Sequence, residues 1–284
     1  MNKKIPLAMA GLVAALILMV LGLSYRNQAA KLVQASLDND LPAVERLLAE
    51  GMDINRQVSN GSTALMAAAH KGYLEVARRL IDAGADVNLK TQQGMTALMY
   101  ASWKGYNGMV KLLLDNGADI DARDANGATA LSGAAGEGHP EVAKTLLERG
   151  ANIDSKADDG RTPLMTASYG GSLEMVKLLL EKGASADVSD KEGFTALMYA
   201  AVKGRTEVAG LLLEKGADVN ARENSGGTAL MLASHEGHTA VVKLFLDKGA
   251  DASVTEKTGK TALSLASSKG HEAVTKLLQK RTPD

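Results

Sequence analysis

The feature that most constrains this chain is a 33-residue repeat that recurs without insertion or deletion. The stretch GADIDARDANGATALSGAAGEGH at 117–139 aligns with GANIDSKADDGRTPLMTASYGGS 33 residues later and with GADVNLKTQQGMTALMYASWKGY 33 residues earlier. A Thr-Ala-Leu or Thr-Pro-Leu triplet marks every copy, at Thr63, Thr96, Thr129, Thr162, Thr195, Thr228 and Thr261. Self-similarity at this period predicts a solenoid of stacked supersecondary units.

Each unit predicts an extended turn, a short helix and a longer helix. Thr63 and its equivalents stand where an N-cap oxygen is needed, just before an apolar segment such as TALMAAAHK. Gly72 and its equivalents separate this helix from the next, YLEVARRLIDA, and Gly84 and its equivalents close it as left-handed C-terminal caps do. Between Gly84 and Gly94 lies a largely polar segment of nine residues, which suits an extended turn.

The second helices carry aliphatic columns that a single unit cannot enclose, so each unit must bury them against the next. One column contains Leu47, Leu80, Leu113, Leu146, Leu179, Leu212, Phe245 and Leu278, and the adjacent one contains Leu48, Ile81, Leu114, Leu147, Leu180, Leu213 and Leu246. In the last unit, polar Gln279 and Thr275 replace apolar members of such columns, as a terminal cap requires. We therefore predict a capping repeat over 25–57, six internal repeats over 58–255 and a C-terminal cap over 256–284.

These motifs, in GADVNAR…GGTALMLAS…GHTAVVKLFLDKGAD, resemble the ankyrin repeat over about nine-tenths of the chain, from Ala29 to Gln279. The resemblance implies an all-α solenoid of about eight helix-turn-helix repeats. One departure is systematic, because the family usually has His after Thr-Pro-Leu. This chain instead has Met66, Met99, Met165, Met198 and Met231, or Ser132 and Ser264. Adaptable thioether packing then replaces the family's Thr–His hydrogen bond.

Residues 1–24 differ from the rest, because Lys3 and Lys4 precede an uncharged apolar run from Leu7 to Leu23. Seventeen helical residues span about 25 Å, the short limit for a bilayer core. We expect an uncleaved transmembrane anchor over residues 5–23, with the repeats on the periplasmic side of the inner membrane. The alternative is a signal peptide cleaved near Gly22-Leu23-Ser24, which leaves a periplasmic or secreted protein.

Composition excludes several functions. Lys and Arg number 32 against 33 acidic residues, which argues against nucleic acid as a partner. The absence of cysteine removes disulfides, thiol catalysis and Cys-based metal sites. Asp86, Asp119, Asp218 and Asp251 share one register in the turns, and His139, His238 and His271 share another, so these residues predict structural roles. We expect no enzymatic activity, no metal site and no cofactor.

In ankyrin proteins the partner lies against the turn tips and the exposed side of the first helices, so the resemblance implies a protein partner on this concave face. The expected contacts are Trp103, Tyr169, Gly136, Gly133, Met95, Phe194, Lys90, Arg123 and Lys156. Gly133 and Gly136 would leave a recess between aromatic neighbours, into which a partner's apolar or aromatic side chain docks. The alternatives are drift for the glycines, lateral packing for the aromatic residues and solvated turn tips for the basic row.

We therefore expect a monomeric, exported scaffold or adaptor that binds another protein. An inhibitor or immunity-type protein, which covers the active site of another exported protein, is the alternative.

Overall fold

The computed structural model describes residues 29–281. The anchor or signal predicted over residues 1–24 lies outside this range. Among the described residues, no helix combines the length and the apolar character that crossing a bilayer requires.

The chain divides into two compact units, which are described separately. Unit 1 comprises described residues 29–101 and 111–119, and unit 2 comprises described residues 102–110 and 120–281. Their border runs through the repeat that contains α5 (Ala97–Trp103) and α6 (Asn107–Asp115).

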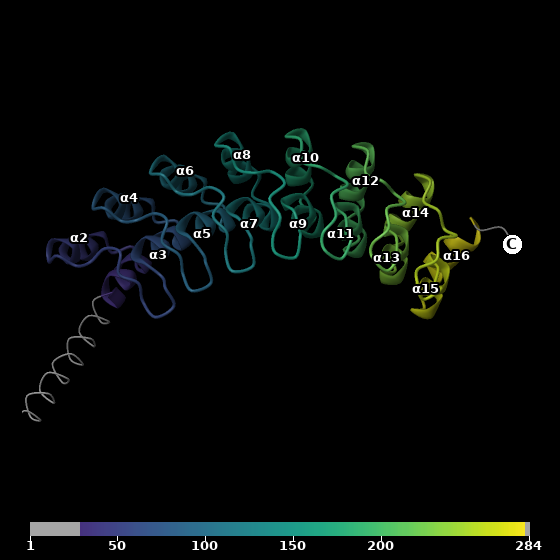
Figure 1. Ribbon diagram of the computed structural model, residues 1–284, viewed down its shortest axis with the longest axis horizontal. Coiled ribbons are helices and arrows are strands. Elements are labelled where there is room, and N and C mark those ends of the chain that lie inside the picture. Colours follow the sequence, from purple (N-terminus) through teal and green to yellow (C-terminus); the bar gives the residue numbers. More distant parts are fainter. Residues whose placement is uncertain (1–28, 282–284) are drawn as a thin grey trace, which may run out of the picture. The chain divides into compact units, whose positions relative to one another are not determined.

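Unit 1 begins with helical residues 29–37, followed by α2 (Leu41–Ala49), α3 (Ala64–Lys71) and α4 (Leu74–Asp82). α3 and α4 pack as a helical hairpin, and α4 also packs against α2 (Figure 1). Asp40 caps α2 by accepting a hydrogen bond from the Ala43 amide at 3.0 Å, and Pro42 follows where its missing N–H costs nothing. Within the predicted N-terminal cap, the described residues therefore form two helices, 29–37 and α2.

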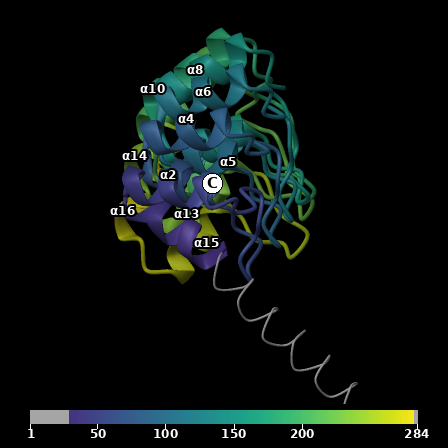
Figure 2. The same ribbon diagram turned by 90° about the vertical axis from the view of Figure 1, so that its left-hand side faces the viewer.

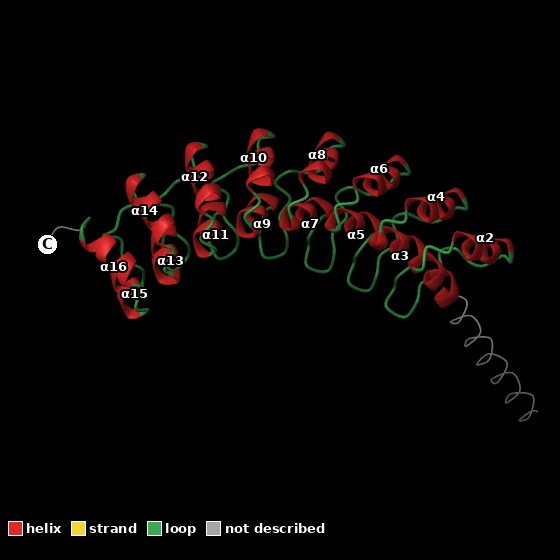
Figure 3. Cartoon of the chain, turned by 180° about the vertical axis from the view of Figure 1, so that it is seen from behind, coloured by secondary structure: helices red, strands yellow, loops and turns green. Residues whose placement is uncertain are grey.

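Unit 2 contains five helical hairpins. Their helices are α7 (Ala130–Glu137), α8 (Pro140–Glu148), α9 (Pro163–Gly170), α10 (Leu173–Glu181), α11 (Ala196–Val202), α12 (Thr206–Glu214), α13 (Ala229–Glu236), α14 (Thr239–Asp247), α15 (Ala262–Ser268) and α16 (Glu272–Gln279). The first helices pack in one row from α7 to α15, and the second helices pack in another from α8 to α16 (Figures 1 and 3). The turns of unit 2 extend from the side of the first helices, away from the second (Figure 2).

The predicted caps are confirmed. Each threonine Oγ1 accepts a hydrogen bond from the amide three residues later, at Thr63, Thr96, Thr129, Thr162, Thr195, Thr228 and Thr261. Gly84 follows α4 with a φ of +94°, a conformation that favours glycine, as the left-handed cap requires. These threonines mark where the first helix of each repeat starts, whereas the N-caps of α4, α8, α12, α14 and α16 form no side-chain hydrogen bond.

The core of unit 2 is largely aliphatic, as expected for a chain in which aromatic residues make up only 3%. In the column that continues from Leu146, the side chains of Leu179, Leu212, Phe245 and Leu278 are fully buried. The adjacent column from Leu147 to Leu213 is only half-buried, so it contributes less than expected. Those residues lie about 100° further around each helix, at the edge of the contact with the next hairpin. The methionines that replace the family histidine are buried, with Met165 and Met198 at 1% and 0% exposure.

Candidate functional site

The acidic turn residues have structural roles, as their shared register predicts. In unit 1, Asn88 Oδ1 accepts from the Asp119 amide at 2.7 Å and its Nδ2 donates to the Gly117 carbonyl at 3.0 Å. Asp86 Oδ1 accepts from the Asn88 amide at 2.8 Å. In unit 2, Asp218 and Asp251 accept in the same way from the amides two residues later. These carboxylates and amides hold consecutive turns in register.

The three histidines in one column also have structural roles. Nε2 of His139, His238 and His271 each donates to a main-chain carbonyl 36 residues earlier, at 3.0 Å in all three cases. The accepting carbonyls lie at or next to the last residue of a first helix, where intrahelical partners are missing. The column therefore caps helix ends. Within residues 29–281, no cluster of three or more His, Cys, Asp or Glu side chains is placed to hold a metal ion.

The basic row at the turn tips links neighbouring turns. Lys156 Nζ donates to the Ser189 carbonyl at 3.2 Å, and Arg123 Nη2 pairs with Asp158 Oδ1 at 2.9 Å. In unit 1, the Lys90 carbonyl accepts from Gln57 Nε2 at 2.7 Å, while the Lys90 side chain is exposed. The row therefore stabilises the turns, and contacts from Lys90, Arg123 and Lys156 to a partner stay a prediction.

Two large aromatic side chains of unit 2 are exposed, Trp103 as the last residue of α5 and Tyr169 near the end of α9. Trp103 and Tyr169 expose 38% and 42% of their surfaces. Lys104 Nζ lies 4.2 Å from the Trp103 ring centroid, and Lys203 Nζ lies 4.4 Å from that of Tyr169. Cations over the ring faces restrict where these rings can move. Two apolar groups are thus held at the surface, as expected for a binding face.

The other predicted apolar contacts are less accessible. Phe194 is half-buried and packs on Tyr199, with ring centroids 5.6 Å apart. Met95, in unit 1, is also half-buried. Phe194 thus packs on a ring of its own repeat, and contacts from Phe194 and Met95 to a partner stay a prediction.

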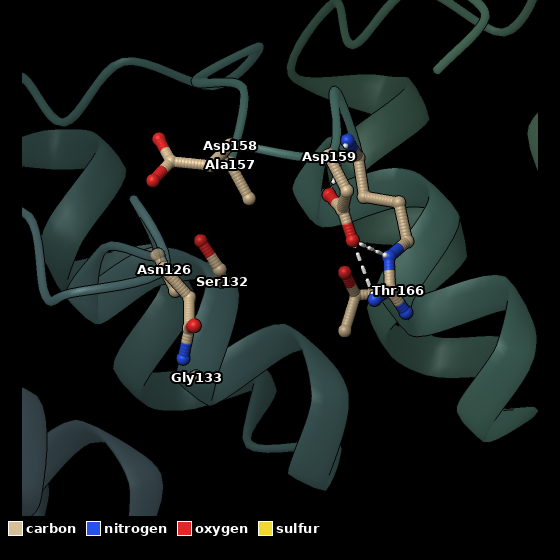
Figure 4. A pocket seen from close by; sticks show the side chains of 9 residues that line it. Asn126, Ser132, Gly133, Ala157, Asp158, Asp159 and Thr166 are labelled. Carbon is tan, nitrogen blue, oxygen red and sulfur yellow. Dashed lines mark hydrogen bonds and ion pairs between the residues drawn. The ribbon is translucent and has the colours of Figure 1, made fainter. Parts of the chain in front are cut away.

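A groove of about 630 Å³ lies in unit 2 between two successive turns and the helices that follow them (Figure 4). We call it the turn groove. It is lined by Asn126, Ala128, Ser132, Gly133, Ala157, Asp158, Asp159, Arg161 and Thr166. Its volume falls within the range of about 300–1,000 Å³ typical of ligand pockets.

The sequence predicted one recess at both glycines of α7, but only one of the two lines the turn groove. Gly133 lines it, and a Cβ atom there would meet nothing closer than Trp103 Cβ at 3.8 Å. Gly136 does not line it, because its α-carbon packs toward α9, where a Cβ atom would lie 3.0 Å from Thr166 Cγ2. The open space is therefore at Gly133, on the turn side, and does not extend to a gap between Trp103 and Tyr169.

The charged groups on the wall of the turn groove are paired. Arg161 donates from Nε to Asp159 Oδ2 at 2.5 Å, and its amide donates to Oδ1 at 3.0 Å (Figure 4). Partial burial opposes ionisation of Asp159, but these hydrogen bonds and the charge of Arg161 hold its pKa below the ordinary value. Asp158 pairs with Arg123, as described above. The turn groove is therefore a largely apolar hollow with neutralised walls.

The sequence interpretation did not identify most of these lining residues. Asn126, Asp158 and Thr166 occupy ordinary turn and helix columns, and nothing in their spacing marks a hollow. Ala128 was a visible signal, since its column has Arg161 and Phe194 in later copies. Ala128 and Gly133, five residues apart, are both smaller than the residues at the same positions in the two later repeats.

Paired helices, projecting turns and a surface of repeat-specific residues define a class of helical repeat proteins that bind other macromolecules. The family model "Ankyrin repeats (3 copies)" matches residues 32–124, 131–223 and 220–284, and the chain belongs to the ankyrin repeat family. Domains of this family are typically non-catalytic and serve as protein-binding scaffolds. No curated protein matches the chain in a sequence comparison.

Proposed function

We propose that the protein binds its partner on the groove face of unit 2, which we define as the turn groove together with Trp103 and Tyr169. The observation that supports this most is the exposure of these two rings, 38% and 42%, in the unit that contains the groove. Aromatic side chains on a rigid support lose little conformational entropy on binding, and they are common binding hot spots.

The partner is a protein, since the ankyrin family binds proteins in general. The walls of the groove are neutralised by the Arg123–Asp158 and Arg161–Asp159 pairs, so a highly charged partner would gain little there. A partner surface with apolar and neutral polar groups fits this face better.

The test is to recover partners by cross-linking and then to measure affinity for each recovered protein with matched variants. Loss of either exposed ring, in Trp103→Ala or Tyr169→Ala, should weaken binding about tenfold or more. Tyr106→Ala is the control, because Tyr106 is 37% exposed but lies in the loop before α6 and does not line the groove. Unchanged affinity in both ring variants would refute the groove face as the contact.

We also propose that the protein is exported and anchored in the inner membrane through residues 5–23, with the repeats outside the cytoplasm. Support comes from the sequence alone, from Lys3 and Lys4 before the apolar run Leu7–Leu23. A reporter that is active only outside the cytoplasm, fused after Asp284, should be active. If the fusion is stably produced but the reporter is inactive, the repeats lie in the cytoplasm and the proposed topology is wrong. Release of the full-length product by carbonate washing would exclude the anchor.

A further inference from the structure

Arg205 of unit 2 stands in the register of the three capping histidines, 33 residues before His238. Its Nε donates to the Tyr169 carbonyl, 36 residues earlier, as each histidine does to its own carbonyl. The distance is 3.4 Å, longer than the 3.0 Å of the histidines. A Cβ atom at Gly171 would lie 2.5 Å from this Nε, so Arg205 covers that glycine as the histidine rings cover theirs. The arginine therefore performs the capping role of this column.

Arginine brings donors that the cap does not use. A neutral histidine has a single ring N–H, which the cap consumes, whereas a guanidinium has several more in a planar fork. Nη1 and Nη2 of Arg205 form no hydrogen bond or ion pair among residues 29–281, and the residue is exposed. Glu207, the nearest carboxylate in the sequence, does not pair with it. The edge formed by Nη1 and Nη2 is therefore open to a ligand from solution.

A second cation and two apolar side chains accompany Arg205. Lys203 Nζ lies over the Tyr169 ring, as described above, and pairs with no carboxylate in the described part of the chain. Tyr169 stands two residues before Gly171 and Leu173 two residues after it. Both are exposed, Leu173 to 39%. We call Tyr169, Leu173, Lys203 and Arg205 the Arg205 patch.

The neighbouring repeats leave the charge of Lys203 uncompensated. The preceding member of its column is Gly170, where a Cβ atom would lie 2.9 Å from the Gly136 carbonyl oxygen, so α9 has no side chain there. The following member is Glu236, which is hydrogen-bonded to His235 Nδ1 at 2.8 Å and does not pair with Lys203. The Arg205 patch thus contains two cations and no anion, unlike the walls of the turn groove, whose charges are paired.

An acidic side chain with apolar neighbours complements this patch. The two oxygens of a carboxylate match two N–H groups of a guanidinium, which gives a bidentate pair. A purely apolar partner would cover Tyr169 and Leu173 but would desolvate the cations without a counter-charge. A basic partner would be repelled by Lys203 and Arg205. Only an acidic residue among apolar ones meets both conditions.

We propose that the Arg205 patch binds an acidic side chain of the partner protein. The carboxylate of this aspartate or glutamate pairs with the Nη1–Nη2 edge of Arg205, and the apolar residues beside it cover Tyr169 and Leu173. The charge of Lys203 adds attraction at low ionic strength. The proposal rests on the protein-binding function of the groove face, which shares Tyr169, and it states the charge that the partner presents beside the turn groove.

The direct test selects ligands for the purified full-length chain from a displayed library of random peptides. A family with Asp or Glu next to an apolar residue should be enriched. In a synthetic member of this family, replacing the acid by its amide should weaken binding about three- to tenfold at low ionic strength, measured by calorimetry. The difference should shrink as salt is added. A selection without an acidic family that depends on Arg205 would overturn the proposal.

Arg205→His separates binding from folding, because histidine makes the same cap in three other repeats. The urea midpoint should stay near that of the wild type, while affinity for the acidic peptide falls about three- to tenfold and affinity for its amide counterpart does not. Lys203→Gln should weaken the acidic peptide about two- to threefold. Lys215→Gln removes an exposed charge at the opposite end of α12 and is the matched control, which should bind as the wild type does.

Three results would contradict the proposal. If Arg205→His binds the acidic peptide as the wild type does, the carboxylate does not pair with Arg205. If sodium phosphate displaces that peptide far more strongly than sodium chloride at equal ionic strength, the patch is a site for a free anion. Peptides that depend on Trp103 but tolerate Arg205→His would leave the proposed function in place and refute the acidic contact. Peptides indifferent to Trp103, Tyr169 and Arg205 would refute both.

Discussion

The two glycines of α7 allow a sharp test of the packing, because the same substitution should have opposite results three residues apart. Replacing glycine by alanine within a helix stabilises it by about 0.5–1 kcal/mol, since alanine loses less backbone entropy on folding. At Gly133 the added methyl group meets Trp103 at 3.8–3.9 Å, an ordinary contact. Gly133→Ala should therefore retain the full gain of about 0.5–1 kcal/mol.

At Gly136 the same methyl group would lie 3.0 Å from Thr166 Cγ2, so α7 and α9 must separate slightly. Overpacking of this kind typically costs about 1–3 kcal/mol, which cancels or exceeds the gain in helix propensity. Gly136→Ala should therefore be neutral or up to about 2 kcal/mol less stable than the wild type. Thr166→Ser removes the clashing methyl group and keeps a hydroxyl that can donate to the Thr162 carbonyl. Adding it to Gly136→Ala should restore most of the loss.

Urea unfolding, followed by circular dichroism and by the fluorescence of Trp103, measures these differences. Trp103 is the only tryptophan and its Cβ faces Gly133, so its fluorescence reports on this part of unit 2. A change of 1 kcal/mol corresponds to about 2–4 °C in melting temperature for a domain of this size. If Gly136→Ala stabilises the protein as much as Gly133→Ala does, the close contact between α7 and α9 is wrong. Additive effects of Gly136→Ala and Thr166→Ser would contradict the same contact.

Other substitutions test the hydrogen bonds that hold the repeats together. Tyr199→Phe should cost about 1–2 kcal/mol near pH 8, measured by urea unfolding, because it removes the donor to Asp190. Burial and this hydrogen bond raise the pKa of Tyr199, so its contribution is complete below about pH 10 and is lost as the pH rises further; the gap between wild type and variant should narrow there. His139→Ala should lower the free energy of unfolding by about 1 kcal/mol, because it removes the hydrogen bond to the Trp103 carbonyl. If the urea midpoint followed by Trp103 fluorescence is the same in the variant and the wild type, this role of His139 is wrong. Asn88→Ala should cost about 1–2 kcal/mol in thermal unfolding, since it removes two bonds between turns, and Asn88→Asp should cost less because it keeps the acceptor.

Much of the fold follows from the sequence because its signals are local. Thr129 caps α7 through an amide three residues away, and Gly84 adopts a positive φ at a helix end, so the neighbouring residues suffice to place both. The register of the aliphatic column through Leu146 and Leu179 predicts burial between hairpins, and both residues are fully buried. The anchor or signal over residues 1–24 stays a prediction, since these residues are outside the described structure.

The site depends on contacts between repeats, which no single repeat specifies. The sequence by itself determined the period, the helical hairpins, the caps and the columns that face the next unit, because these depend on residues a few positions apart. Only the tertiary structure decided that Gly133 opens a groove while Gly136 packs against Thr166, since the two glycines differ in what α9 places opposite them.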